Sequence, residues 1–202
     1  MPATLSKPEM QKRDLTARTL TLRAKSVNES DRSFEAVVAT ETPAQVFDMR
    51  SFEVIDEVLV ADGGEFPDKV VLLDDHQRHS GINSVIGSAS RFRQEGDRWI
   101  GRGVVGRAVD GNIHRQQLWQ DLVDGHIDSV SIGYRVSEFV YIPAGQSEVI
   151  RGRKYTAEDR TLRITTQWQV LELSLTPIPA DDETKIRTQA GLVAHKPRSY
   201  FR

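Results

Sequence analysis

Cysteine is absent from the 202 residues of this chain. Its absence excludes disulfide bonds, metal centres with cysteine ligands and a catalytic thiol. Long apolar runs are absent too, because no stretch approaches the ~20 residues that a membrane-spanning helix needs. The first 18 residues lack the apolar core of a signal peptide. We therefore expect no membrane partner, and we expect no cofactor.

An excess of one charge is also lacking, because 27 Lys and Arg residues oppose 29 Asp and Glu residues. Proteins that coat nucleic acid usually carry a basic excess, so we expect no nucleic-acid partner. The length suits one domain with a real core. We predict a polar leader at 1–16, one domain at 17–181 and a basic tail at 182–202. Residues 184–202 hold five Lys or Arg and no acid, which is typical of a tail.

Alternation of apolar and polar residues dominates the chain and predicts many strands. The clearest are at 34–40, at 70–73 and in a hairpin whose turn is at 94–97. Two further strands are predicted at 162–164 and 170–175. This pattern favours a β-dominated α+β domain.

One helix is predicted over 112–124, with Asp110 as its N-cap and Gly125 as its stop. Residues 43–60 fit either a helix or an extended chain, because their apolar spacing suits both. Residues 143–160 are rich in Pro, Gly and charge, and this composition predicts an exposed loop.

The segment LLDDHQRHSG places a histidine where an apolar strand ends. A base at a strand end is held rigidly and can still be reached by a substrate, so His76 is a candidate general base. Asp74, Asp75, His76 and His79 form an alternative metal site, although their spacing is not that of a typical zinc site. A solvated acidic loop is the third interpretation.

The segment DSVSIGYRV reads as a strand with Ser129, Ser131 and Gly133 on one face and the apolar residues between them on the other. When glycine follows a serine two residues later, no bulky side chain lies beside the serine hydroxyl on that face. A peptide can then approach the hydroxyl, as a nucleophile requires. The alternation does not separate Ser129 from Ser131 as that nucleophile. The polar face of an ordinary amphipathic strand is the competing interpretation.

A third segment, VLELSLTPIPAD, places Glu172 and Ser174 on one face of a strand and Leu171, Leu173 and Leu175 on the other. A carboxylate beside a histidine can fix its tautomer and stabilise the imidazolium. An outward-facing charge is the simpler alternative.

In this order, the three segments resemble those of the prohead (capsid maturation) serine proteases of HK97-type tailed bacteriophages, which belong to the herpesvirus assemblin-like superfamily. That family has an LL-x-x-H strand, a later S-I-G-Y strand and a closing E-[LV]-S-L-[VT]-x-x-P-A segment. The counterparts here are LLDDH at 72–76, SIGY at 131–134 and ELSLTPIPA at 172–180. The resemblance is loosest over residues 42–66.

The resemblance implies a Ser-His-Glu triad, with Ser131 as nucleophile, His76 as base and Glu172 as the acid that orients His76. In the herpesvirus branch a second histidine fills the third role, so His79 and His114 are the alternatives to Glu172. Substrate-binding residues are not assigned by the resemblance.

The family's fold is an antiparallel β-barrel, closed or nearly closed, flanked by a few helices. Its members act inside the procapsid in the host cytoplasm. There they cleave the scaffold protein, or the scaffolding segment of the major capsid protein, and often themselves. Herpesvirus relatives act as dimers, so a homodimer is an open expectation for this chain.

Three other classes of function compete with a serine protease. The first is an inactive structural or scaffolding protein of the virion with the same fold. The second is a metal-dependent hydrolase that uses the Asp74, Asp75, His76 and His79 cluster. The third is a small β-barrel binding module in which SIGY is only a strand.

Overall fold

The computed structural model describes residues 15–21, 26–108 and 112–177. Most of the predicted leader and all of the predicted tail lie outside these residues. The strands are β1 (Leu15–Thr21), β2 (Ser33–Thr40), β3 (Ala44–Asp48), β4 (Glu53–Leu59), β5 (Gly64–Glu65), β6 (Lys69–Asp74), β7 (Val85–Glu95), β8 (Arg98–Val105), β9 (Ser129–Ile142), β10 (Ser147–Ile150), β11 (Arg153–Thr156) and β12 (Leu162–Thr176). The helices are α1 (Ile113–Asp124) and two short 3-10 helices, η1 (Ala61–Gly63) and η2 (Gly81–Ser84).

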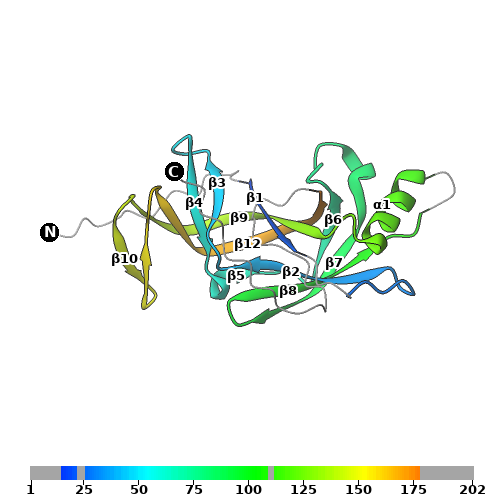
Figure 1. Ribbon diagram of the computed structural model, residues 1–202, viewed down its shortest axis with the longest axis horizontal. Coiled ribbons are helices and arrows are strands. Elements are labelled where there is room, and N and C mark those ends of the chain that lie inside the picture. Colours follow the sequence, from blue (N-terminus) through cyan, green and yellow to red (C-terminus); the bar gives the residue numbers. More distant parts are fainter. Residues whose placement is uncertain (1–14, 22–25, 109–111, 178–202) are drawn as a thin grey trace, which may run out of the picture.

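A mixed sheet of ten strands forms the body of the protein (Figure 1). Its main path runs β1-β9-β12-β6-β7-β8-β2, and β3, β4 and β5 join it at the side. The long strand β12 pairs antiparallel with β9 and parallel with β4, β5 and β6. Strand β12 therefore brings the ends of several distant segments together.

The β-dominated α+β class is confirmed, with a single α-helix among the described residues where a few were expected. The first and last strands of the main path, β1 and β2, lie against each other. Between the described residues of these two strands no ladder is formed. The expected closed barrel is therefore not confirmed. No helix in the described ranges is long and apolar enough to cross a membrane.

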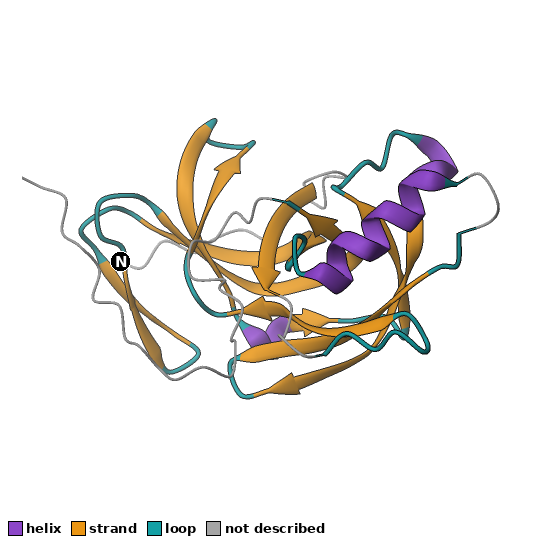
Figure 2. Cartoon of the chain, turned by 45° about the vertical axis from the view of Figure 1, so that its right-hand side comes forward, coloured by secondary structure: helices purple, strands orange, loops and turns teal. Residues whose placement is uncertain are grey.

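Helix α1 crosses one face of the sheet and closes the main core (Figure 2). It contributes Leu118, Trp119 and Leu122 to that core, and Gly125 ends it with the left-handed φ of 80° that glycine adopts easily. The predicted cap was wrong: Asn112 accepts a hydrogen bond from the amide of Arg115 at 3.0 Å. Asparagine immediately before the first helical residue is a preferred N-cap, and Asp110 lies outside the described residues.

Of the two alternatives for residues 43–60, the extended one is confirmed, because this segment forms β3 and β4. Two other predictions about elements need correction. The predicted loop at 143–160 contains the hairpin β10–β11, whose polar composition reflects a ribbon that is exposed on both faces. The two strands predicted at 162–164 and 170–175 are one continuous strand, β12, because a strand buried on both faces shows no regular alternation.

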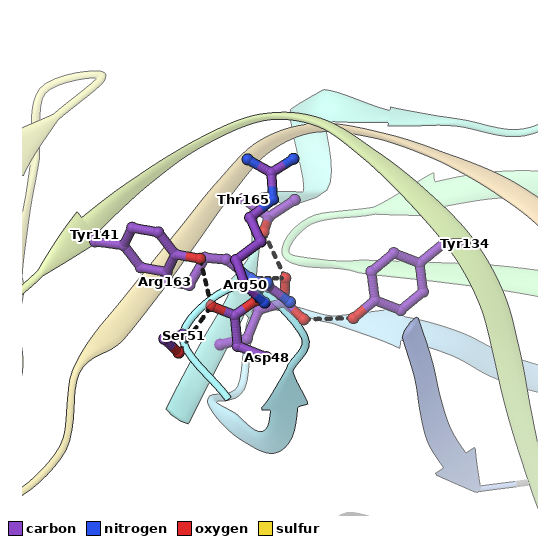
Figure 3. Close-up of polar contacts among 8 residues, drawn as sticks. Asp48, Arg50, Ser51, Tyr134, Tyr141, Arg163 and Thr165 are labelled. Carbon is purple, nitrogen blue, oxygen red and sulfur yellow. Dashed lines mark hydrogen bonds and ion pairs between the residues drawn. The ribbon is translucent and has the colours of Figure 1, made fainter. Parts of the chain in front are cut away.

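A buried polar network ties β3 and β4 to the β9–β12 ribbon (Figure 3). Its centre is Arg163, whose Nε donates to Glu57 at 2.9 Å and whose Nη1 donates to Asp48 at 3.1 Å. Tyr134 and Thr165 donate their hydroxyls to Glu57. These charges are removed from water, since Glu57 is 0% and Arg163 is 4% exposed.

The charges of this network stabilise one another. Burial alone raises the pKa of Asp48, but hydrogen bonds from Tyr141 and Ser51 and the charge of Arg163 hold that pKa below its ordinary value. Burial and the hydrogen bond to Asp48 raise the pKa of Tyr141 to about 12. Burial opposes the charged form of Arg163, yet Glu57 more than offsets this and raises the pKa of the guanidinium. Asp48 and Arg163 are therefore ionised at neutral pH, whereas Tyr141 keeps its proton.

Replacing Arg163 by methionine removes a cation that donates to both Glu57 and Asp48. We expect the free energy of unfolding to fall by about 3–5 kcal/mol at neutral pH, because both buried carboxylates lose the charge of Arg163. Urea unfolding followed by tryptophan fluorescence measures the change. Arg98→Met is the control, since Arg98 is exposed and its pairing with Asp97 is exposed too, and its effect should be below about 0.5 kcal/mol. A loss below about 1 kcal/mol for Arg163→Met would contradict the assignment.

Candidate functional site

The three segments singled out in the sequence lie side by side at one end of the sheet. Strand β12 is the middle strand, with β9 antiparallel on one side and β6 parallel on the other. Opposite Ser174 of β12 lies Ser131 of β9, and opposite Glu172 lies Gly133. Directly paired residues project from the same face of a sheet. Ser131, Gly133, Glu172 and Ser174 therefore share one face.

A β-bulge in β12 decides which face Glu172 occupies. Val170 pairs with Tyr134 and Glu172 pairs with the next residue of β9, Gly133, so Leu171 has no partner in this ladder. The extra residue reverses the alternation along β12. Val170 faces the core before the bulge, and Leu173 faces it afterwards. Leu171, predicted on the same face as Leu173 and Leu175, is therefore outside the alternation. The prediction that Glu172 and Ser174 share a face is confirmed.

A tight turn carries His76 at the end of β6. The amide of Asp75 continues the sheet by donating to the carbonyl of Leu175 at 2.9 Å. Asp75 and His76 then both adopt the left-handed region, with φ of 41° and 56°, and the amide of Gln77 closes the turn on the carbonyl of Asp74 at 2.9 Å. Two consecutive residues with positive φ are unfavourable without glycine and occur mostly at functional sites.

His76 and Glu172 are in direct contact. The Nδ1 atom of His76 lies 2.7 Å from Oε1 of Glu172. The backbone amide of His76 also donates to the hydroxyl of Ser174 at 3.1 Å, and that hydroxyl donates to Oε2 of Glu172 at 2.7 Å. Nη2 of Arg78 donates to Oε1 of Glu172 at 2.6 Å. Three side chains thus converge on one carboxylate that is 2% exposed.

The electrostatics of the site keep Glu172 ionised. Burial raises the pKa of this carboxyl, but the hydrogen bonds and charge of His76 and the hydrogen bonds of Arg78 and Ser174 outweigh burial and hold the pKa below its ordinary value. An ionised Glu172 can only accept a hydrogen bond, so Nδ1 of His76 carries the proton that it donates to Glu172. Nε2 of His76 is then the basic nitrogen. This is the tautomer that a general base requires.

Ser131 belongs to the same face of the sheet as Glu172 and Ser174. Its neighbour across the ladder is Ser174, and side chains that face each other across a ladder have Cβ atoms ~5 Å apart. Ser131 is 0% exposed, and β1 runs beside it, with Thr19 opposite Ser131. A substrate can reach Ser131 only after a local opening.

The alternatives to these residues make other contacts. Ser129 donates its hydroxyl to Asp128 at 2.8 Å and is two residues farther from Gly133 along β9 than Ser131 is. Nε2 of His114 lies 2.9 Å from Oδ2 of Asp74. Within the described ranges, no group of three or more His, Cys, Asp or Glu side chains is arranged to hold a metal ion. The metal site proposed from the sequence is therefore not assembled.

Two members of the site were missed in the sequence analysis. Arg78 lies two residues after His76, and Ser174 lies two residues after Glu172. The position of Ser174 on the face of Glu172 was a usable signal, because a hydroxyl beside a buried carboxylate is a natural donor. Arg78 gave no such signal, since its reach depends on the turn at Asp75 and His76.

A family model described as caudovirus prohead serine protease matches residues 69–198. The match begins at β6 and spans more than half of the chain, including all three site segments. The chain therefore belongs to this family of serine peptidases, which act in phage capsid maturation. No curated protein and no solved structure matches the chain.

The lowered pKa of Glu172 makes its contribution to stability depend on pH. A carboxyl whose pKa is depressed by folding stabilises the protein above its unfolded pKa and loses this effect as pH falls through the folded pKa. We expect Glu172→Gln to lower the free energy of unfolding by about 2 kcal/mol near pH 7. The difference should shrink below the ordinary glutamate value of 4.5. Urea titrations of both proteins over this range measure it, and exposed Glu65→Gln is the control. A difference that is constant down to acid pH would refute the shift.

Gly133 leaves room for the partners of Glu172. A Cβ atom at this position would lie 1.7 Å from Nη2 of Arg78 and 2.3 Å from Oε1 of Glu172. Both groups are held by their mutual bond, so we expect Gly133→Ala to destabilise the fold by about 1–3 kcal/mol. Gly106→Ala is the matched control, because its Cβ would meet nothing nearer than 3.3 Å. Thermal unfolding of the two variants should differ clearly, and equal melting temperatures would contradict the packing described.

Proposed function

We propose that this member of the prohead serine protease family hydrolyses peptide bonds with Ser131 as nucleophile, His76 as general base and Glu172 as the acid that orients the base. The observation that carries the proposal is the 2.7 Å contact between Nδ1 of His76 and Oε1 of Glu172. That contact joins two of the three residues proposed from the sequence, although they lie 96 positions apart in the chain.

The proposed reaction is acyl transfer. Oγ of Ser131 attacks the scissile carbonyl, and Nε2 of His76 takes the hydroxyl proton. The imidazolium that forms is stabilised by Glu172 through Nδ1. His76 then gives the proton to the leaving amine, and water releases the acyl group from Ser131 by the same steps in reverse order.

The placement of Ser174 supports this geometry. Its hydroxyl accepts from the backbone of His76 and donates to Glu172, so a single side chain fixes both partners of the dyad. Ser174 also lies directly across the ladder from Ser131. The proposal requires the hydroxyl of Ser131 to meet Nε2 of His76 when substrate binds, since hydrogen bonds of catalytic groups often tighten only at that stage.

The proposed substrates are the scaffold protein, or the scaffolding segment of the major capsid protein, and the protease chain itself. The proposed place of action is the interior of the procapsid in the host cytoplasm. Burial of Ser131 supports a nucleophile that is held back until assembly, because a protease that acts early would destroy the scaffold before the shell is complete.

The test is co-expression of the full chain with the major capsid and scaffold proteins of the same phage, with intact mass as the readout. We expect the wild-type chain to trim a partner and Ser131→Ala to reduce trimming by about a thousandfold or more. His76→Ala should behave in the same way, and Glu172→Gln should lose less. Ser129→Ala is the matched control, a serine two residues away on the same face, and it should retain activity.

Circular dichroism establishes that each variant is folded. Trimming by Ser131→Ala at the wild-type rate would remove Ser131 as nucleophile. Loss of trimming in Ser129→Ala alone would transfer that role to Ser129. Absence of processing in the wild-type chain with every partner would favour an inactive structural protein of the same fold, and inhibition of trimming by a chelator alone would favour a metal-dependent hydrolase.

A further inference from the structure

Arg78 reaches the carboxylate that orients His76. Its Nη2 donates to Oε1 of Glu172 at 2.6 Å, and Nδ1 of His76 lies 2.7 Å from the same oxygen. The other carboxylate oxygen, Oε2, accepts from Ser174. One negative charge is therefore shared between an imidazole and a guanidinium on a single oxygen atom.

The position of Arg78 follows from this bond. Its guanidinium lies on the backbone of Gly133, at a distance that only glycine permits. Its Nε is buried and has no hydrogen-bond partner among the described residues. A buried donor is rarely left without an acceptor, so contact with Glu172, and not the satisfaction of its own donors, accounts for the placement of Arg78.

The shared oxygen has a consequence for a general base. A buried carboxylate beside an imidazole favours the protonated ring, and a protonated ring cannot accept the proton of a nucleophile. A second cation on the same oxygen opposes this effect, because it takes part of the negative charge and repels a proton on the ring. Arg78 is placed to do both.

We propose that Arg78 is a positioning residue of the triad, which holds Glu172 over Gly133 and limits its charge so that His76 stays neutral to lower pH. The inference rests on the proposed role of His76 as general base. It adds a residue that acts through Glu172 and does not itself meet the substrate.

The other charged groups near His76 do not supply this effect. Asp75 belongs to the same turn and carries the opposite charge. Asp74 is paired with His114 of α1 at 2.9 Å. His79 lies three residues further along the chain and is exposed, and Arg135 is exposed two residues beyond Gly133 on β9. All of them remain in the variants compared below, so their contributions cancel.

The direct test is an NMR titration of the His76 ring in the full chain that carries Ser131→Ala, which prevents self-processing. In the added variant Arg78→Gln we expect the midpoint of the His76 titration to rise by about one pH unit. Arg78→Lys keeps the charge and should leave the midpoint at its reference value. Arg98→Gln, the loss of an exposed arginine, is the control and should have no effect. Arg78→Met replaces Arg78→Gln if the latter does not fold.

The second readout is the pH profile of kcat/KM for trimming in the chain with Ser131 intact. The acidic limb should move to higher pH in Arg78→Gln and should stay in place in Arg78→Lys. A purely structural role for Arg78 would lower the rate by the same factor at every pH. A His76 midpoint that is unchanged or lowered in folded Arg78→Gln overturns the inference. If the wild-type chain trims nothing, the proposed function fails, whereas the NMR titration still decides the effect of Arg78 on His76.

Discussion

The one-residue bulge at Leu171 is the constraint on which the site depends. Without it, Glu172 would pair with Ile132 and project into the hydrophobic core, where a carboxylate has no donors. With it, Glu172 lies opposite Gly133 and on the face of Ser131. Because Leu171 is unpaired, the face of the sheet on which a given side chain of β12 lies changes at this residue. Before the bulge, Val170 packs in the core. After the bulge, Glu172 and Ser174 lie on the opposite face, with Ser131 and Gly133.

Burial of the Glu172 carboxylate then dictates what surrounds it. A buried charge must be paired and hydrogen-bonded, and the strands supply donors from three directions: His76 and Arg78 from the turn after β6, and Ser174 from β12 itself. The turn contains two consecutive left-handed residues, Asp75 and His76, and its side chains His76 and Arg78 both bind Oε1 of Glu172. The backbone strain of the turn thus accompanies the pairing of this carboxylate. The tautomer of His76 is a consequence of that pairing.

Much of this arrangement could be predicted from local sequence, because strand alternation fixes faces. The common face of Ser131 and Gly133 followed directly from the period of two. The pairing of His76 with Glu172 needed the resemblance to a family, since nothing local relates positions 96 residues apart. The error at Leu171 shows the limit of alternation: a bulge inserts one residue without any mark in composition. Residues 143–160 were missed as strands for another reason, because a ribbon exposed on both faces has no apolar period to detect.

The SIGY segment of β9 lies between two buried carboxylates, Glu172 and Glu57, which have different surroundings. Ser131 and Gly133 project toward Glu172, whereas Tyr134 projects to the opposite face and donates its hydroxyl to Glu57. Each carboxylate binds an arginine, but the side chain of Arg163 beside Glu57 is 5% exposed, whereas the side chain of Arg78 beside Glu172 is 25% exposed. An enclosed ion pair mainly specifies how strands pack, since no group can enter or leave it. A pair that is open on one side can change its interactions as protons move, which is the property that the dyad of His76 and Glu172 requires.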